Sequence, residues 1–209
     1  MKPWHALLDV LAPEDCAGCG GPRDEGGLLC AACRQELPER LRPLTVPAPL
    51  AWGMALGPYD GPLGGLVRQG KYRPDPLAID AVAAQLAAAA RGRLPVVDAV
   101  VPVPVPLRRR LQRGFNQAEV LARAVAEAQG LPILHALRRV RPTEQAGRSH
   151  RERADGARGA FRLVRPVPAR VLLVDDVVTT GGTAAACADE LLCGGATRVG
   201  LLCAAAAAL

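Results

Sequence analysis

The chain has 209 residues and a formal net charge of +6, and half of its residues are hydrophobic whereas only 3% are aromatic. This length suffices for one good core plus a small additional module. A core made mainly of Ala, Leu and Val favours an α/β layer fold over a β sandwich. The glycines and prolines stand between apolar runs and at turns, which argues against a disordered chain.

The positive charge is almost entirely arginine, since Lys2 and Lys71 are the only lysines. Arginine suits planar contacts to phosphate, so the composition is compatible with a phosphate-rich ligand or with nucleic acid. A base-composition bias of the genome would also enrich arginine codons. Met1–Leu11 is too short and too polar for a signal peptide or a membrane span, so we expect a cytoplasmic protein without membrane insertion.

Residues 1–45 contain two C-x-x-C pairs, Cys16/Cys19 and Cys30/Cys33, with Gly-rich turns. Four thiolates presented in this way match tetrahedral Zn²⁺, and four protein ligands would make a closed structural site. Redox-active or unligated thiols are the alternative, but a redox pair is usually single and attached to a βαβ unit. We therefore predict a four-cysteine zinc-binding module. The other cysteines, Cys187, Cys193 and Cys203, fall on apolar stretches and are expected in the core.

Residues 50–209 alternate apolar runs with Ala-rich stretches, which predicts βα units and a parallel sheet flanked by helices. Pro102 and Pro104 should end a strand that begins at Ala99, and Gly130 should end a helix that begins at Asn116. The tail 204–209 predicts no element. In chain order the expected elements are a helix over Ile79–Arg91, a strand from Ala99 toward Val105, a helix over Asn116–Gln129, a strand over Val171–Val174, a helix over Thr183–Leu192 and a strand over Arg198–Cys203.

The segment from Val171 to Thr183 combines an aliphatic strand, two acids, threonines and glycines at the start of a helix. The glycines allow several N–H groups to face one anion, and the helix adds its dipole. The acids suit ribose hydroxyls or Mg²⁺ better than a phosphate. An ordinary strand–turn–helix is the alternative. The predicted ligands are Asp175 and Asp176 for ribose and Mg²⁺, and Thr179, Thr180, Gly181, Gly182 and Thr183 for a 5-phosphate.

This segment resembles the signature of type I phosphoribosyltransferases. A second motif is upstream, where Val101-Pro102-Val103-Pro104 precedes arginines 108–110 and 113 and then Gly114-Phe115-Asn116-Gln117. Asn116 is expected to cap the following helix. The arginines suit a pyrophosphate or a nucleic-acid backbone, or they are a solvated helix start.

Together with Lys71-Tyr72-Arg73, with Thr143, Gln145 and Arg153, and with both cysteine pairs, these motifs resemble the ComF family of phosphoribosyltransferase-like proteins over nearly the whole chain. The resemblance implies a type I phosphoribosyltransferase-like domain over residues 50–209 that binds phosphoribosyl pyrophosphate with Mg²⁺. Candidate pyrophosphate contacts are Lys71, Pro104 and Arg113, although Lys71 also fits a solvated turn.

The span from Arg138 to Arg170 is rich in arginine, and its part from Thr143 to Arg158 lacks a hydrophobic period. We expect a mobile hood over the ligand, with a single-stranded DNA track or a flexible charged loop as alternatives. The resemblance further implies a role in natural transformation, assisting uptake or processing of single-stranded DNA beside a helicase-like competence protein and other DNA-processing proteins. A catalytically inactive adaptor that senses ribose phosphate and a nucleobase-salvage phosphoribosyltransferase remain alternatives, because no general base is evident.

Overall fold

The computed structural model describes residues 15–23, 27–72, 75–106, 111, 114–140 and 159–207. Its centre is a five-stranded sheet in the order β1-β2-β7-β6-β3. All neighbours are parallel except the short β1, which is antiparallel to β2. The strands are β1 (Arg42–Pro43), β2 (Trp52–Pro58), β3 (Ala99–Pro102), β6 (Arg170–Val178) and β7 (Arg198–Ala206).

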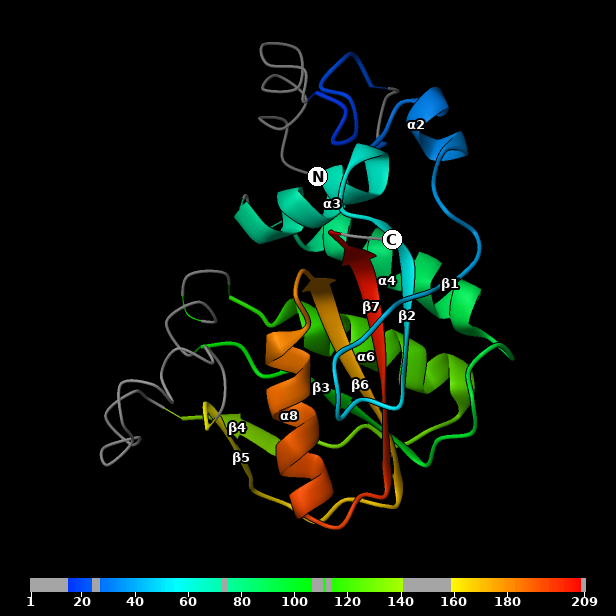
Figure 1. Cartoon of the computed structure of the whole chain (residues 1–209). Helices are drawn as coiled ribbons and strands as arrows, with labels where there is room; N and C mark the ends of the chain where they lie inside the picture. Colours follow the sequence, from blue (N-terminus) through cyan, green and yellow to red (C-terminus); the bar gives the residue numbers. More distant parts are fainter. Residues whose placement is uncertain are drawn as a thin grey trace.

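Helices cover both faces of this sheet (Figure 1). One face packs against α3 (Gly61–Tyr72), α4 (Pro76–Ala90) and α6 (Gln117–Gln129). The other packs against α8 (Gly182–Cys193) and a hairpin of β4 (Leu137–Arg139) and β5 (Phe161–Leu163). A short helix, α2 (Ala31–Gln35), belongs to the cysteine region. The predicted α/β architecture, with a parallel sheet flanked by helices, is confirmed.

Strand β6 shows why the chain folds in layers. Leu172 and Val174 belong to the hydrophobic cluster under α3, α4 and α6, whereas Val171 and Leu173 belong to the cluster under α8. Alternate side chains of a strand point to opposite faces, so an all-aliphatic strand is buried on both sides.

The predicted helix boundaries are close to those observed. The Asn116 side chain caps α6 by accepting from the Ala118 N–H at 3.2 Å, and Gly130 ends this helix with a φ of 65°. Strand β3 ends at Pro102, as the prolines predicted. Helix α4 begins earlier than expected, because Asp75 caps it and Pro76 occupies its first turn.

Two strands are longer than the sequence predicted. β6 continues through the two aspartates to Val178, and β7 continues through the alanine tail to Ala206. The two extensions pair with each other, with Asp175 opposite Cys203 and Val178 opposite Ala206. Alanine has a low intrinsic strand preference, but burial in the sheet overrides it.

The expectation for the cysteines outside the module was partly wrong. Cys187 and Cys203 are buried, but Cys193 is exposed as the last residue of α8.

Elements β2, α3, β4 and β5 were not predicted individually. In the described part of the chain, no helix is both long and apolar enough to cross a membrane.

Candidate functional site

The four module cysteines converge on one point. The Sγ atoms of Cys16, Cys19, Cys30 and Cys33 all lie within 4.8 Å of one another, and the Cys19 and Cys30 sulfurs are 3.9 Å apart. Four sulfur ligands in this arrangement fit a tetrahedral structural Zn²⁺. We call described residues 15–23 and 27–36 the zinc module.

Hydrogen bonds within the module favour the thiolate form of Cys16 even without a bound metal. Burial by itself would raise the pKa of Cys16, but N–H donors, first that of Cys30 and then those of Cys19 and Gly18, lower it to about 6. The Cys30 N–H lies 3.3 Å from the Cys16 sulfur. Zinc requires thiolates, so this geometry supports metal binding. The pKa of Cys33 is raised instead, chiefly by burial and then by the neighbouring cysteines.

A second cluster lies at the carboxyl edge of the sheet, where Asp175 and Asp176 (the acidic pair) stand near the end of β6. Asp175 is 9% exposed, and its Oδ1 accepts from the Asp176 N–H at 2.8 Å. Asp176 Oδ1 accepts from the Val177 N–H at 2.8 Å. Burial, and next the charge of Asp176, raise the pKa of Asp175 well above its usual range. A positive charge nearby would favour the ionised form of such a buried carboxylate pair.

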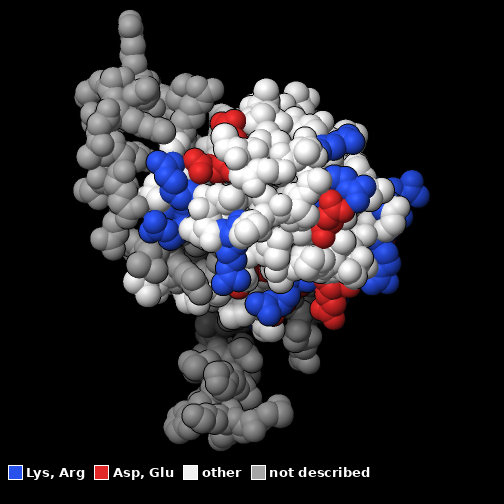
Figure 2. Space-filling model, turned by 90° about the horizontal axis from the view of Figure 1, so that it is seen from below, with Lys and Arg blue, Asp and Glu red and all other residues white. Residues whose placement is uncertain are grey.

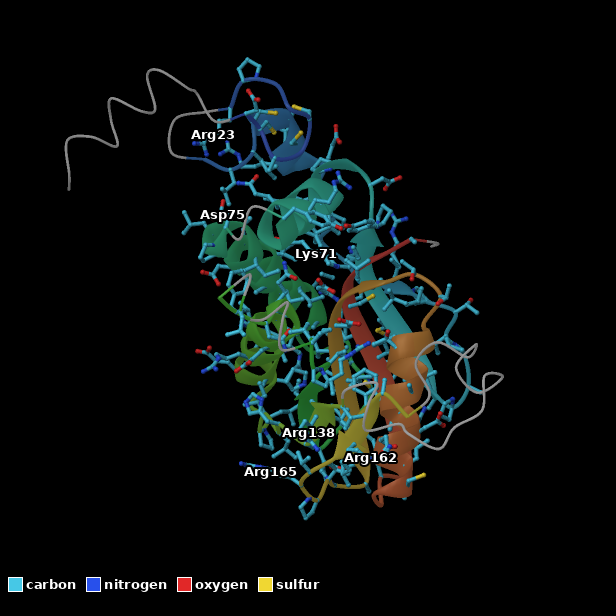
Figure 3. The ribbon with its side chains drawn as sticks, turned by 90° about the vertical axis from the view of Figure 1, so that its left-hand side faces the viewer. Arg23, Lys71, Asp75, Arg138, Arg162 and Arg165 are labelled. Carbon is cyan, nitrogen blue, oxygen red and sulfur yellow. The ribbon has the colours of Figure 1, made fainter. Side chains whose placement is uncertain are left out.

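Lys71 supplies that counter-charge. It lies in the last turn of α3, and its Nζ is 3.0 Å from Asp176 Oδ2, with the two side chains only 17% and 13% exposed. Figure 3 shows Lys71 where α3 meets the end of the sheet. The alternative of a solvated turn lysine is therefore wrong. The sequence singled out Lys71 as an isolated lysine, but it did not indicate this partner.

The predicted phosphate-binding residues 179–183, which we call the phosphate loop, follow β6 and include the first two residues of α8. Thr179 and Thr180 are exposed, and Gly181 precedes α8 with a φ of 76° and no side chain to cap the helix. A Cβ on Gly181 would lie 2.6 Å from Pro47 Cδ, whereas a Cβ on Gly182 would come no closer than 3.7 Å to Thr180 Oγ1. The loop therefore presents hydroxyls and a helix N-terminus at the same edge as the acidic pair.

The loop after β3 reaches this edge as well. The Val103 N–H donates to the Val174 carbonyl at 2.9 Å, and Asn116 Nδ2 donates to the Val103 carbonyl at 3.2 Å. Pro104, half-buried, follows directly. These bonds fix the beginning of the proline segment beside β6. Arg113, the arginines at 108–110 and the predicted hood 143–158 lie outside the described residues.

Three described arginines lie at the opposite end of the sheet from Lys71. Figure 3 places Arg138, Arg162 and Arg165 there, far from Lys71. Arg162 pairs with Glu190 at 3.1 Å, and Arg170 pairs with Asp98. Figure 2 shows that, on the described part of this face, blue and red side chains are interspersed. This face therefore offers no continuous basic track among its described residues.

Comparisons with known proteins match parts of the chain. Residues 7–44 match the double zinc ribbon domain family. The solved structure of glutamine phosphoribosylpyrophosphate amidotransferase from B. subtilis is similar over 60% of this chain and 25% of its own, with a TM-score of 0.43 and 26% sequence identity.

Relatives cover most of the chain. The DNA utilization protein YhgH of Salmonella typhi is 35% identical over 196 residues, which are 90% of this chain and 82% of that protein. The protein of the same name from Escherichia coli K12 is 34% identical over 90% of this chain and 82% of its own. Competence protein F of Haemophilus influenzae is 30% identical over 80% of this chain and 74% of its own. The chain therefore belongs to the ComF family, with these competence and DNA utilization proteins.

Proposed function

We propose that this protein binds phosphoribosyl pyrophosphate with Mg²⁺ at the carboxyl edge of its sheet and assists the uptake or processing of single-stranded DNA in the cytoplasm. The observation that carries the ligand assignment is the continuous unit of acidic pair, phosphate loop and helix start. Its hydroxyls and unpaired helix N–H groups suit a terminal phosphate, while the carboxylates suit ribose hydroxyls. The DNA role rests on the names of the competence and DNA utilization relatives.

The donor set at this edge fits Mg²⁺, because the carboxylates of Asp175 and Asp176 are hard oxygen ligands. When bound, the ion would offset the charge of the pyrophosphate group. In the proposed complex Asp175 and Asp176 orient the ribose and hold the ion, and residues 179–183 hold the 5-phosphate. Lys71 and Pro104, with Arg113, face the pyrophosphate. Lys71 must then exchange its contact with Asp176 for one with the ligand.

Calorimetry with phosphoribosyl pyrophosphate and Mg²⁺ tests the ligand assignment. We expect binding to the wild type and a loss of at least about 100-fold in affinity for Asp175→Asn/Asp176→Asn, since both ribose and metal contacts are removed. Asp80→Asn, at an exposed position of α4, is the matched control and should bind normally. No heat of binding with the wild type would refute the assignment.

The biological role is tested by transformation of a strain that lacks this gene. Complementation with the wild type should restore DNA uptake, and complementation with Asp175→Asn/Asp176→Asn should not. Full rescue by the double variant would show that the acidic pair is dispensable for this role.

A ligand-sensing adaptor without turnover is the second candidate, and the Lys71–Asp176 pair favours it. Lys71 compensates the negative charge of Asp176, so this carboxylate has a counter-charge without any ligand. Measurement of pyrophosphate release across a panel of nucleobases separates the candidates. Binding without release supports the adaptor, whereas release with one base supports a salvage phosphoribosyltransferase, in which catalysis would depend on positioning and charge stabilisation.

A further inference from the structure

Helix α3 lies beside the zinc module (Figure 1), and its last turn contacts the acidic pair. Toward its beginning, Gly65 packs against the module so closely that an added Cβ would lie 1.9 Å from the Ala17 carbonyl oxygen. An added Cβ on Gly18 would likewise lie 3.1 Å from Pro62 Cα. At its end, Lys71 reaches Asp176 at 3.0 Å. One continuous helix therefore has one site at each end.

The contact with the module is a shared core. Leu63, Leu66 and Val67 of α3 are buried in the same hydrophobic cluster as Cys16 and Cys33. These two cysteines are metal ligands, so the position of the sulfurs and the position of the helix depend on the same packing. Close-packed interiors transmit a displacement rather than absorb it.

The helix has no interruption between its two contacts. Gly65 and Lys71 both lie within α3, and six residues of helix span about 9 Å. A shift at Gly65 therefore moves the backbone of Lys71. Because Lys71 and Asp176 are largely buried, a small displacement breaks a contact that water would not replace equally.

We propose that the zinc module is a positioning element for Lys71, holding α3 at the depth where this lysine meets the acidic pair. Zinc binding and ligand binding are then coupled through α3, although the two sites share no residue. The Lys71 contact stands on the structure, and only its effect on phosphoribosyl pyrophosphate rests on the proposed function.

The two lysines of the chain allow a direct measurement of the contact. Protein labelled with ¹³Cε-lysine gives one signal for Lys2 and one for Lys71, and Lys2→Arg assigns them. Titration of zinc into the zinc-free protein should move the Lys71 signal in proportion to zinc occupancy, while the Lys2 signal stays. A Lys71 signal that is the same in the folded zinc-free and zinc-loaded protein would overturn the proposal.

Matched glycine variants of the zinc-loaded protein test the path. Gly65→Ala must separate the helix from Ala17, so its Lys71 signal should move toward that of the zinc-free protein. Gly70→Ala is the control on the same helix, because its Cβ would be no closer than 3.4 Å to Ile79 Cβ, an ordinary contact. Equal Lys71 signals in Gly65→Ala and wild type would contradict a path through α3. The zinc titration of the wild type decides the question if Gly65→Ala does not fold.

Calorimetry with phosphoribosyl pyrophosphate and Mg²⁺ measures the consequence. We expect Gly65→Ala to weaken binding roughly tenfold, within the usual range of coupling between sites, and Gly70→Ala to bind like the wild type. In a Lys71→Met background Gly65→Ala should cause no further loss, which a general structural effect would not reproduce. Additive losses would overturn the role of Lys71. If the wild type does not bind, the proposed function fails, and the lysine signals alone decide the positioning.

Discussion

The zinc module draws its four ligands from one short stretch, residues 16–33, whereas the carboxyl-edge site combines Lys71 of α3 with the acidic pair and phosphate loop of β6 and α8. The module has little core of its own, and its buried cysteines join the cluster under α3. The carboxyl-edge site is supported by a complete sheet but contains a buried carboxylate. A metal therefore stabilises the first region, while the second depends on the stability of the fold to hold its charged side chains together.

Zinc removal should cause the largest effect and test the first half of this comparison. Chelation is expected to lower the free energy of unfolding by several kcal/mol and the midpoint of thermal unfolding by about 10 °C or more. Differential scanning calorimetry with zinc quantification measures this. Cys193→Ser, at an exposed cysteine outside the module, should unfold like the wild type. An unchanged midpoint after complete zinc loss would show that the module is stable without metal.

Gly181→Ala should give the next largest effect and test the rigidity of the phosphate loop. The positive φ and the close approach of Pro47 should together cost about 2 kcal/mol of stability and weaken phosphoribosyl pyrophosphate binding. Gly182→Ala, where the Cβ has room, should change stability little. Urea unfolding and calorimetry compare the two. Similar losses in both variants would contradict a special conformation at Gly181.

Asp175→Asn should stabilise the ligand-free protein by about 1 kcal/mol near neutral pH while weakening ligand binding. The raised pKa of Asp175 means that the folded state keeps a proton that the unfolded chain releases. The contribution of this proton to the free energy of unfolding is complete below the pKa of Asp175 in the unfolded chain. It is lost as pH rises through the pKa of Asp175 in the folded protein. Urea unfolding from about pH 4 to about pH 8 should therefore show a decline in the wild type that is smaller in Asp175→Asn. A less stable variant with an unchanged pH slope would contradict the assignment.

The smallest expected effect is the coupling between Lys71 and Asp176. A double-mutant cycle of Lys71→Met and Asp176→Asn should give about 0.5 to 1 kcal/mol in unfolding free energy, because the pair is largely but not fully buried. The exposed i,i+4 pair Glu119–Arg123 is a control and should give less. A coupling near zero for Lys71 and Asp176 would mean that the lysine does not stabilise the acidic pair.

Local patterns in the sequence predicted much of both regions. The spacing of Cys16, Cys19, Cys30 and Cys33 was enough for the zinc module, because its ligands are close in sequence and need only short turns. The aliphatic run before Asp175 predicted a buried parallel strand, and Asn116 and Gly130 predicted the ends of α6. In each case the cause acts within a few residues.

The tertiary structure alone decided how distant residues meet. It extended β6 through the acidic pair, because β7 provides partners for Asp175, Val177 and Val178. It brought Lys71 to Asp176 and Pro47 to Gly181, and it joined the zinc module to α3 through Gly65 and Ala17. The sequence by itself determined the zinc ligands and which side chains residues 179–183 carry. Which charges neutralise each other, and which helix connects the two sites, follow from the packing of the sheet and its helices.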